Sequence, residues 1–197
     1  MLPPVFPCQL RFMERWRAAR VLGKYSRLRY AGAYWSESRG YFYLIGIMNL
    51  KSCSPKETRQ LASRLALKIN NPHKTALVLA LSGDLGAGKT TFAQGLAESL
   101  GAKTRALSPT FVLMRKHTIK SKHYRALYHI DAYRLRSDKE ALSLELKDIL
   151  RDGRNIVLIE WAERIKKALP QDAIWIKFSH TKKGDERNIK ILGGTMN

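Results

Sequence analysis

The sequence predicts an α/β fold in which a mixed, largely parallel central sheet lies between two layers of helices. Two short apolar runs, at 75–81 and 155–160, have the length and composition of strands that are covered on both faces. A glycine-rich loop follows the first run and leads directly into an amphipathic helix pattern at 89–100. Because strand, glycine-rich loop and helix in this order are typical of P-loop domains, we expect a three-layer sandwich of the P-loop NTPase type.

Local signals set the elements on either side of that loop. A capping box at 54–57, with proline at the first helical position, begins a helix that runs to about Ile69. The segment Asn70-Asn71-Pro72 ends this helix before the first apolar strand. The helix at 89–100 carries its apolar residues on one stripe, and Gly101 supplies its C-terminal stop.

The second half of the chain continues the alternation of strands and helices. Besides the run at 155–160, we expect four strands, at 111–114, 125–130, 174–178 and 188–192. The basic stretch 116–122 lies between the first two, and we interpret it as a hairpin turn. A second capping box at 137–140 begins a helix that reaches about Leu150, and a shorter helix ends near Leu169.

The glycine-rich loop is the clearest chemical signal in the chain. Gly83-Asp84-Leu85-Gly86-Ala87-Gly88-Lys89-Thr90 matches the phosphate-binding pattern G-x-x-x-x-G-K-[ST] in full, and Thr91 follows it. The glycines allow backbone conformations in which successive N–H groups converge on phosphate oxygens. Lys89 supplies a cation for the β- and γ-phosphates, Thr90 offers a hydroxyl to Mg²⁺, and the helix dipole adds positive potential. The pattern therefore predicts nucleotide binding.

A magnesium ion at such a loop needs a carboxylate from a neighbouring strand, and two candidates have the required position. Asp131 follows the strand at 125–130, and Glu160 ends the more continuously apolar strand at 155–160. Spacing does not choose between them, and either could instead cap a helix. Thr110 lies where a loop that senses the γ-phosphate would be expected, and Trp161 could stack on a base or belong to the core.

The chain is strongly basic, with 36 Lys and Arg against 16 Asp and Glu and a formal net charge of +20. This excess exceeds what a bound nucleotide needs, so an acidic partner is expected, RNA first among the candidates. Cys8 and Cys53 form no metal-binding pattern. No apolar run is long enough to cross a membrane, and we expect a cytoplasmic protein without membrane contact.

Residues 1–47 differ from the rest of the chain, with eight Lys or Arg against two acidic residues. Neither a transit peptide nor a secretory signal fits them, because aromatic residues cluster at 41–43 and the apolar stretch 41–48 comes late. We expect the true start near Met48, which would leave residues 1–47 as an uncertain extension and 48–197 as a single P-loop ATPase domain.

Four segments together resemble the TsaE family of bacterial ATPases: 81–92 with the phosphate-binding loop, Ser108-Pro-Thr-Phe111, Tyr128-His-Ile-Asp131 with Tyr133-Arg-Leu135, and Val157-Leu-Ile-Glu-Trp161. The resemblance covers residues 54–192 and leaves residues 1–47 outside it. It implies ATP as the nucleotide, and a slow, partner-stimulated hydrolysis that supports threonylcarbamoyladenosine formation in tRNA. The implied partners are TsaB and TsaD, with tRNA contacted through their complex.

The resemblance also implies roles for particular residues. Lys89 and the loop 83–91 would hold the phosphates, with Thr90 on Mg²⁺ and Thr110 in a switch loop. Asp131 and Glu160 would lie at the metal and the attacking water, and Trp161 near the nucleotide. The hairpin at 115–125 is unusually basic for the family pattern, and its contact with tRNA stays open.

Two other functions fit parts of the sequence. A small P-loop kinase would pass the γ-phosphate to an acceptor, with Arg134 and Arg136 as lid residues. An RNA-binding module without catalysis would use ATP only to lock a conformation. A new phosphoester would identify the first, and tRNA binding without phosphate release would identify the second.

Overall fold

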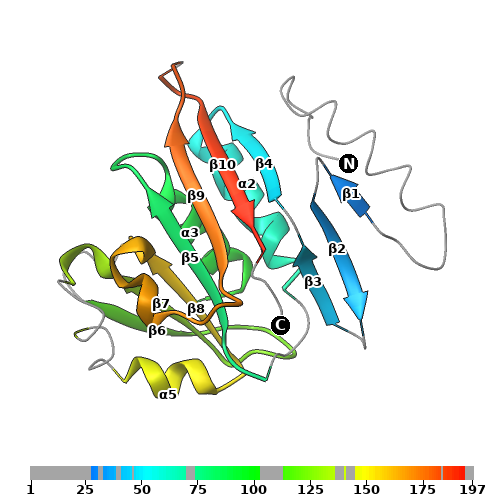
Figure 1. Cartoon of the computed structure of the whole chain (residues 1–197), viewed down its shortest axis with the longest axis vertical. Coiled ribbons are helices and arrows are strands. Elements are labelled where there is room, and N and C mark those ends of the chain that lie inside the picture. The colour runs from blue at the N-terminus through cyan, green and yellow to red at the C-terminus, as the bar shows by residue number, and fades with distance from the viewer. Residues whose placement is uncertain are drawn as a thin grey trace.

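A seven-stranded sheet forms the centre of the protein, in the strand order β4-β10-β9-β5-β8-β7-β6. The computed structural model describes residues 28–30, 33–38, 41–45, 47–69, 74–102, 113–135, 140, 145–182 and 184–193. The pairings that join β9, β5, β8 and β7 are parallel, and the three outer pairings are antiparallel. The strands are β4 (Ile47–Ser52), β5 (Leu77–Gly83), β6 (Met114–Thr118), β7 (Ala126–Asp131), β8 (Asn155–Glu160), β9 (Ile174–His180) and β10 (Arg187–Leu192), as Figure 1 shows.

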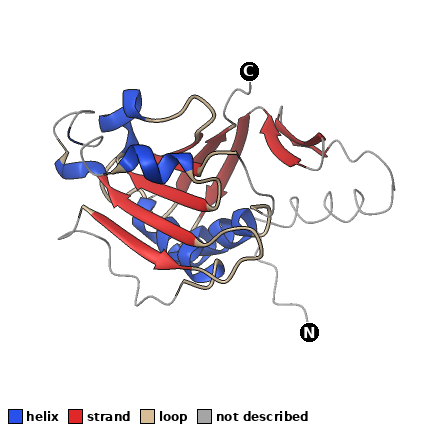
Figure 2. Ribbon diagram, turned by 90° about the horizontal axis from the view of Figure 1, so that it is seen from below, coloured by secondary structure: helices blue, strands red, loops and turns tan. Residues whose placement is uncertain are grey.

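Helices cover both faces of this sheet, which confirms the predicted α/β fold class (Figure 2). The long helices α2 (Pro55–Ala66) and α3 (Lys89–Ser99) pack on one face. The shorter α5 (Leu146–Arg151) and the 3₁₀ helices η1 (Ala132–Arg134) and η2 (Ala162–Ala168) cover the other. None of the described helices is long and apolar enough to cross a membrane.

The central strands β5 and β8 contribute side chains to two hydrophobic cores, one on each face of the sheet. Along β5, Leu77, Leu79 and Leu81 pack toward α2 and α3, while Val78 and Ala80 pack toward the opposite helices. All six residues of β8 are buried. Because successive side chains of a strand point to opposite faces, a strand covered on both sides has no polar face, which explains the two continuous apolar runs of the sequence.

The first capping box forms as predicted. Ser54 Oγ accepts the backbone N–H of Glu57 at 3.2 Å, and Glu57 Oε2 accepts the backbone N–H of Cys53 at 2.8 Å. The helix that begins here packs closely on α3 at Gly95, where a Cβ atom would lie 2.7 Å from Cα of Arg59. The box therefore fixes the start of a helix whose position depends on a glycine in its neighbour.

The predicted hairpin is present, but the interpretation of 116–122 as its turn was wrong in part. Lys116 to Thr118 belong to β6, and the connection runs from Ile119 to Arg125. Lys116 pairs with Tyr128 across the hairpin, and its ammonium group lies 5.5 Å from the centre of that ring. β6 is an edge strand of the sheet, and edge strands accommodate lysine well.

The predicted continuous helix from 137 to about 150 was also wrong over its described part. Glu145 has a positive φ of 58°, so α5 begins as a separate helix at Leu146. A left-handed residue cannot continue a helix, which explains the break. Residues 137–139 of the second capping box lie outside the described residues.

The strands that precede α2 were not predicted. β4 pairs antiparallel with β10, with Met48 opposite Ile191, at one edge of the main sheet. Further strands, β1 (Leu28–Tyr30), β2 (Ala33–Ser38) and β3 (Tyr41–Ile45), form a separate antiparallel sheet. Met48 thus lies within a strand of the main sheet, and a start of the protein near it stays a prediction.

Candidate functional site

The glycine-rich loop connects the carboxyl end of β5 to the first turn of α3. Gly83, Gly86 and Gly88 all have positive φ angles, of 123°, 72° and 103°. At Gly83 a Cβ atom would lie 2.0 Å from the carbonyl oxygen of Phe178 on the neighbouring strand β9. Gly88 caps the N-terminus of α3 without a side chain, which leaves the helix N–H groups directed toward the loop. The loop therefore has the backbone shape of an anion cradle.

Lys89 folds over this loop and is only 4% exposed. Its ammonium group donates to the carbonyl oxygens of Gly83 at 2.6 Å and Asp84 at 2.7 Å. It also lies 3.8 Å from the centre of the Trp161 ring. Burial lowers the pKa of Lys89, and the nearby carboxylates, Glu163 foremost, act in the opposite direction. The cation is thus held at the loop by oxygens and a π face.

Thr90 and Glu160 meet beside the loop. The Thr90 hydroxyl donates to Oε2 of Glu160 at 2.6 Å, and Nε2 of His129 lies 2.9 Å from the other carboxylate oxygen, Oε1. Glu160 is 3% exposed and His129 is 6% exposed. Both oxygens of this buried carboxylate therefore have a partner, and the carboxylate joins the end of β8 to the first turn of α3.

Asp131, the second predicted carboxylate, lies next to Glu160 in the sheet, where the two residues are paired in register. Its Oδ1 accepts the backbone N–H of Tyr133 at 3.0 Å, so it caps the 3₁₀ helix η1. The side chain is half-buried, in contrast to that of Glu160. The structure thus places both carboxylates at the same edge of the sheet, with Glu160 alone hydrogen-bonded to Thr90.

Trp161 follows Glu160 in a left-handed backbone conformation, with φ of 59° and ψ of 37°. This turn carries its ring over the Lys89 ammonium group. The Tyr133 ring lies 5.0 Å from it, and the Arg164 guanidinium lies 5.7 Å from the centre of the Tyr133 ring. Non-glycine residues adopt such angles rarely, and they cluster at functional sites. Trp161 therefore belongs to the site, where its ring packs against the Lys89 ammonium group.

A histidine of β9 contacts the tip of the glycine-rich loop. Leu85 is 80% exposed, yet its carbonyl oxygen lies 3.0 Å from Nε2 of His180. Thr91 follows in the first turn of α3, and Thr110 lies outside the described residues. Within the described residues no group of three or more His, Cys, Asp or Glu side chains could hold a metal ion by itself. A metal here would depend on Thr90 and on ligand oxygens.

Sequence reasoning identified the loop, both carboxylates and Trp161 but missed His129 and His180. A signal for His129 was present, because it lies two residues before Asp131 on one strand. Residues two apart on a strand share a face, and β7 and β8 are neighbours. His180 could not be found in this way, since its contact with Leu85 depends on the pairing of β9 with β5.

Comparisons with known proteins point to one family. The family model "Threonylcarbamoyl adenosine biosynthesis protein TsaE" matches residues 52–189. The chain is similar to the tRNA threonylcarbamoyladenosine biosynthesis proteins TsaE of Bacillus subtilis, with 37% identity over 71% of this chain and 81% of that protein, and of Rickettsia bellii, with 40% identity over 71% and 83%. The crystal structure of YdiB from Bacillus subtilis superposes with a TM-score of 0.62 at 30% identity, and covers 77% of this chain and 88% of its own.

Proposed function

Since the chain belongs to the TsaE family of threonylcarbamoyl adenosine biosynthesis proteins, we propose that it binds ATP with Mg²⁺ and hydrolyses it slowly. The hydrolysis would support threonylcarbamoyladenosine formation in tRNA, in the cytoplasm. TsaB and TsaD are the proposed partners, and tRNA is reached through their complex. One observation carries the proposal: the Thr90 hydroxyl lies 2.6 Å from a buried carboxylate at the mouth of a complete phosphate-binding loop.

The residues of the loop fit a nucleoside triphosphate. The three positive-φ glycines keep side chains away from the loop backbone, so N–H groups at the start of α3 can approach phosphate oxygens. Lys89 can turn from the carbonyls of Gly83 and Asp84 to the β- and γ-phosphates, because its side chain is long and already lies at the loop. Trp161 keeps that lysine against the site and excludes water from one side.

Thr90, Glu160 and Asp131 are the proposed groups for Mg²⁺ and the attacking water. ATP would supply the γ-phosphoryl group that water attacks, with ADP as the leaving group, and Mg²⁺ would supply a divalent charge that neutralises phosphate oxygens. Thr90 provides a hydroxyl oxygen, and Glu160 orients that hydroxyl and accepts hydrogen bonds from water. His129 holds Glu160 in place through Oε1. Thr110 is the proposed residue of a switch loop, and Asp131 is the second candidate for the metal.

Slow turnover is expected of the isolated protein. Lys89 is the cation that hydrogen-bonds to the carbonyl oxygens of the loop, and Arg134 lies on η1 next to Tyr133. Transition-state charge would then be stabilised mainly by Lys89 and by backbone N–H groups. A partner that supplies or orients an arginine would raise the rate, as in other P-loop enzymes. We therefore expect low activity alone and stimulation by TsaB with TsaD.

The decisive experiment measures phosphate release by the purified protein, with and without TsaB and TsaD. Lys89→Ala should abolish release and weaken nucleotide binding, because the only lysine of the loop is lost. Lys177→Ala, on the exposed face of β9, is the matched control and should leave both unchanged. Phosphorus NMR should show free phosphate. Unchanged turnover in Lys89→Ala would refute the site, and a new phosphoester would identify a kinase.

A further inference from the structure

The end of the main sheet opposite the phosphate-binding loop carries a cluster of basic side chains that the proposed function does not use. We call it the basic end surface and define it by five residues: Lys120, Lys122, Arg125, Arg151 and Arg154. Lys120, Lys122 and Arg125 are exposed. The side chains of Arg151 and Arg154 are 78% and 49% exposed. Five cations are therefore available to solvent at one end of the molecule.

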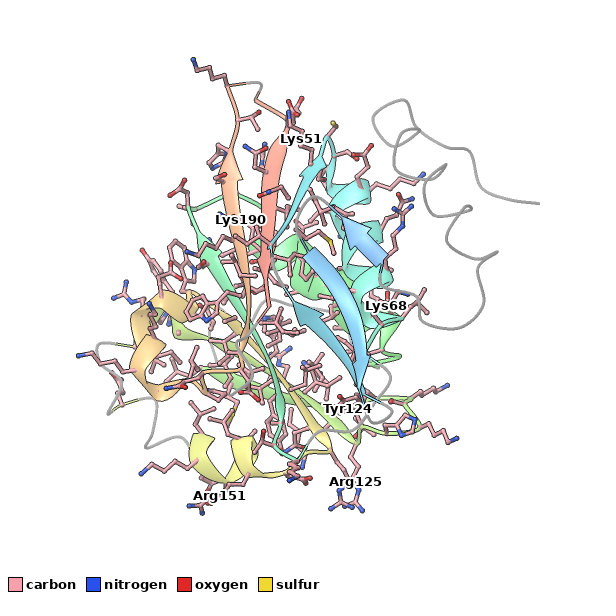
Figure 3. The ribbon with its side chains drawn as sticks, turned by 45° about the vertical axis from the view of Figure 1, so that its right-hand side comes forward. Lys51, Lys68, Tyr124, Arg125, Arg151 and Lys190 are labelled. Atoms are coloured by element: carbon pink, nitrogen blue, oxygen red, sulfur yellow. The ribbon has the colours of Figure 1, made fainter. Side chains whose placement is uncertain are left out.

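Different parts of the chain bring these residues together. Lys120, Lys122 and Arg125 lie on the connection between β6 and β7. The backbone N–H of Arg125 donates to the carbonyl of Arg154 at 2.8 Å, which joins this connection to the turn before β8. Arg151 ends α5, directly before that turn. Figure 3 shows Arg125 and Arg151 at the same end of the molecule, both pointing outward. The fold therefore brings these basic residues together from separate parts of the chain.

Among the described residues, acidic side chains balance only two of the five cations of this surface. Asp148 pairs with Arg151 and Asp152 pairs with Arg154, each at 3.3 Å. The hydrogen bond from the backbone N–H of Arg154 and the charges of Arg154 and Arg125 lower the pKa of Asp152, which favours its ionised form. The sequence from 113 to 130 contains no Asp or Glu. Lys120, Lys122 and Arg125 form no ion pair within the described part of the chain.

The surface is well separated from the nucleotide site. Arg125 precedes β7, and Asp131 ends it beside Glu160. Six strand residues at about 3.3 Å each give a separation of roughly 20 Å along the sheet. A macromolecule bound at the basic end surface would therefore leave the phosphate-binding loop accessible, and changes at one site should leave the other intact.

We propose that the basic end surface binds the phosphate backbone of RNA directly, with tRNA as the RNA concerned. The inference rests on the proposed function in tRNA modification and adds a contact made by this chain itself. Arginine and lysine side chains suit phosphate groups, and neutralisation of several phosphates gives most of the affinity of sequence-independent binding. The overall charge of +20 favours association with a polyanion.

The apolar residues near this surface argue against an anionic membrane as the partner. Membrane association of a basic surface is usually completed by apolar or aromatic side chains that enter the interface. On the β6–β7 connection, Ile119 is 7% exposed and Tyr124 is 2% exposed. Among the described residues, this connection thus presents cations but no apolar side chain that could enter a membrane. This is typical of a surface that binds the phosphate backbone of a nucleic acid.

Binding of the full chain to an unmodified tRNA transcript tests the proposal. The variant Lys120→Gln/Lys122→Gln/Arg125→Gln removes three charges from the surface. The control Lys177→Gln/Lys182→Gln/Lys190→Gln removes three exposed charges, one each from β9, the segment between β9 and β10, and β10. The first variant should weaken binding about tenfold or more at low salt, and reduce the slope of log K against log salt by roughly two to three. The control should retain most of the affinity.

Two further variants serve as controls for the tRNA-binding experiment. Lys120→Arg/Lys122→Arg/Arg125→Lys keeps the charges and should bind tRNA as the unchanged protein does. Lys89→Ala should also bind tRNA normally, so loss of ATP hydrolysis would not be confused with loss of RNA binding. Equal weakening by the surface variant and the control, or no weakening by either, would overturn the proposal. So would surface-dependent binding to phosphatidylserine vesicles in place of tRNA.

Discussion

Replacement of His129 by leucine should reveal how far the buried Glu160 depends on its neighbours. Glu160 is 3% exposed, and its two carboxylate oxygens have one partner each, Thr90 at 2.6 Å and His129 at 2.9 Å. Leucine fills a similar volume without a hydrogen-bonding group, so Oε1 loses its partner in a buried position. An unsatisfied buried acceptor costs about 1–3 kcal/mol, and a charged one costs more. We expect a loss of about 2–4 kcal/mol.

Urea unfolding without nucleotide measures this loss, and a double-mutant cycle identifies its cause. His129→Gln keeps an N–H donor and should cost about 1 kcal/mol or less. In a Glu160→Gln background, where no buried charge needs the imidazole, His129→Leu should cost less by about 0.5–3 kcal/mol. The affinity for ATP with Mg²⁺ should fall in parallel. An identical cost of His129→Leu in both backgrounds would refute the reasoning, because the imidazole would then act only by its volume.

Three further predictions concern the fold around the site. Gly83→Ala should lower the free energy of unfolding by at least about 2 kcal/mol, since a Cβ atom would lie 2.0 Å from the carbonyl oxygen of Phe178 at a φ of 123°; thermal unfolding measures this, and a normal melting temperature would contradict it. Ser54→Ala should cost about 0.5–2 kcal/mol through loss of the hydrogen bond from Glu57, whereas Ser54→Asp, which keeps a cap, should cost less. Burial, with His129 and Arg115 adding to it, lowers the pKa of His117. The unfolded chain then binds more protons just below its ordinary pKa of 6.5, so the free energy of unfolding should rise as the pH is raised toward about 6.5, and His117→Gln should flatten that rise in urea titrations at several pH values.

The capping box at Ser54 and the strands β5 and β8 could be predicted from the sequence because local signals agree with burial at those positions. β4 could not be predicted in this way. Only its alternate residues Met48 and Leu50 are apolar residues that pack against the core, and its partner β10 is far away in the sequence. Such a strand is defined by pairing over a long separation and leaves a weak local pattern.

The candidate site likewise contains features that could be predicted from the sequence and features that could not. The loop 83–90 is recognisable because its chemistry is contained in eight consecutive residues. The choice between Asp131 and Glu160 depends on which carboxylate the first turn of α3 meets, and only the packing of α3 beside β8 places Thr90 next to Glu160. The basic stretch 116–122 looked like a turn because charge is common in turns, but an edge strand tolerates charge equally well.

The pairing of β4 with β10 has a consequence for folding during synthesis. Ile47 stands opposite Leu192, and within the described part of the chain β4, the first strand of the main sheet, pairs only with β10, its last strand in sequence. On the ribosome, β4 must stay unpaired until β10 has been made and released, while α2 and α3 can already pack together. The amide groups of β4 should therefore be the last of the main sheet to gain protection from hydrogen exchange as the nascent chain lengthens, and a chain that stops before Arg187 would leave β4 without a partner and β9 as an open edge.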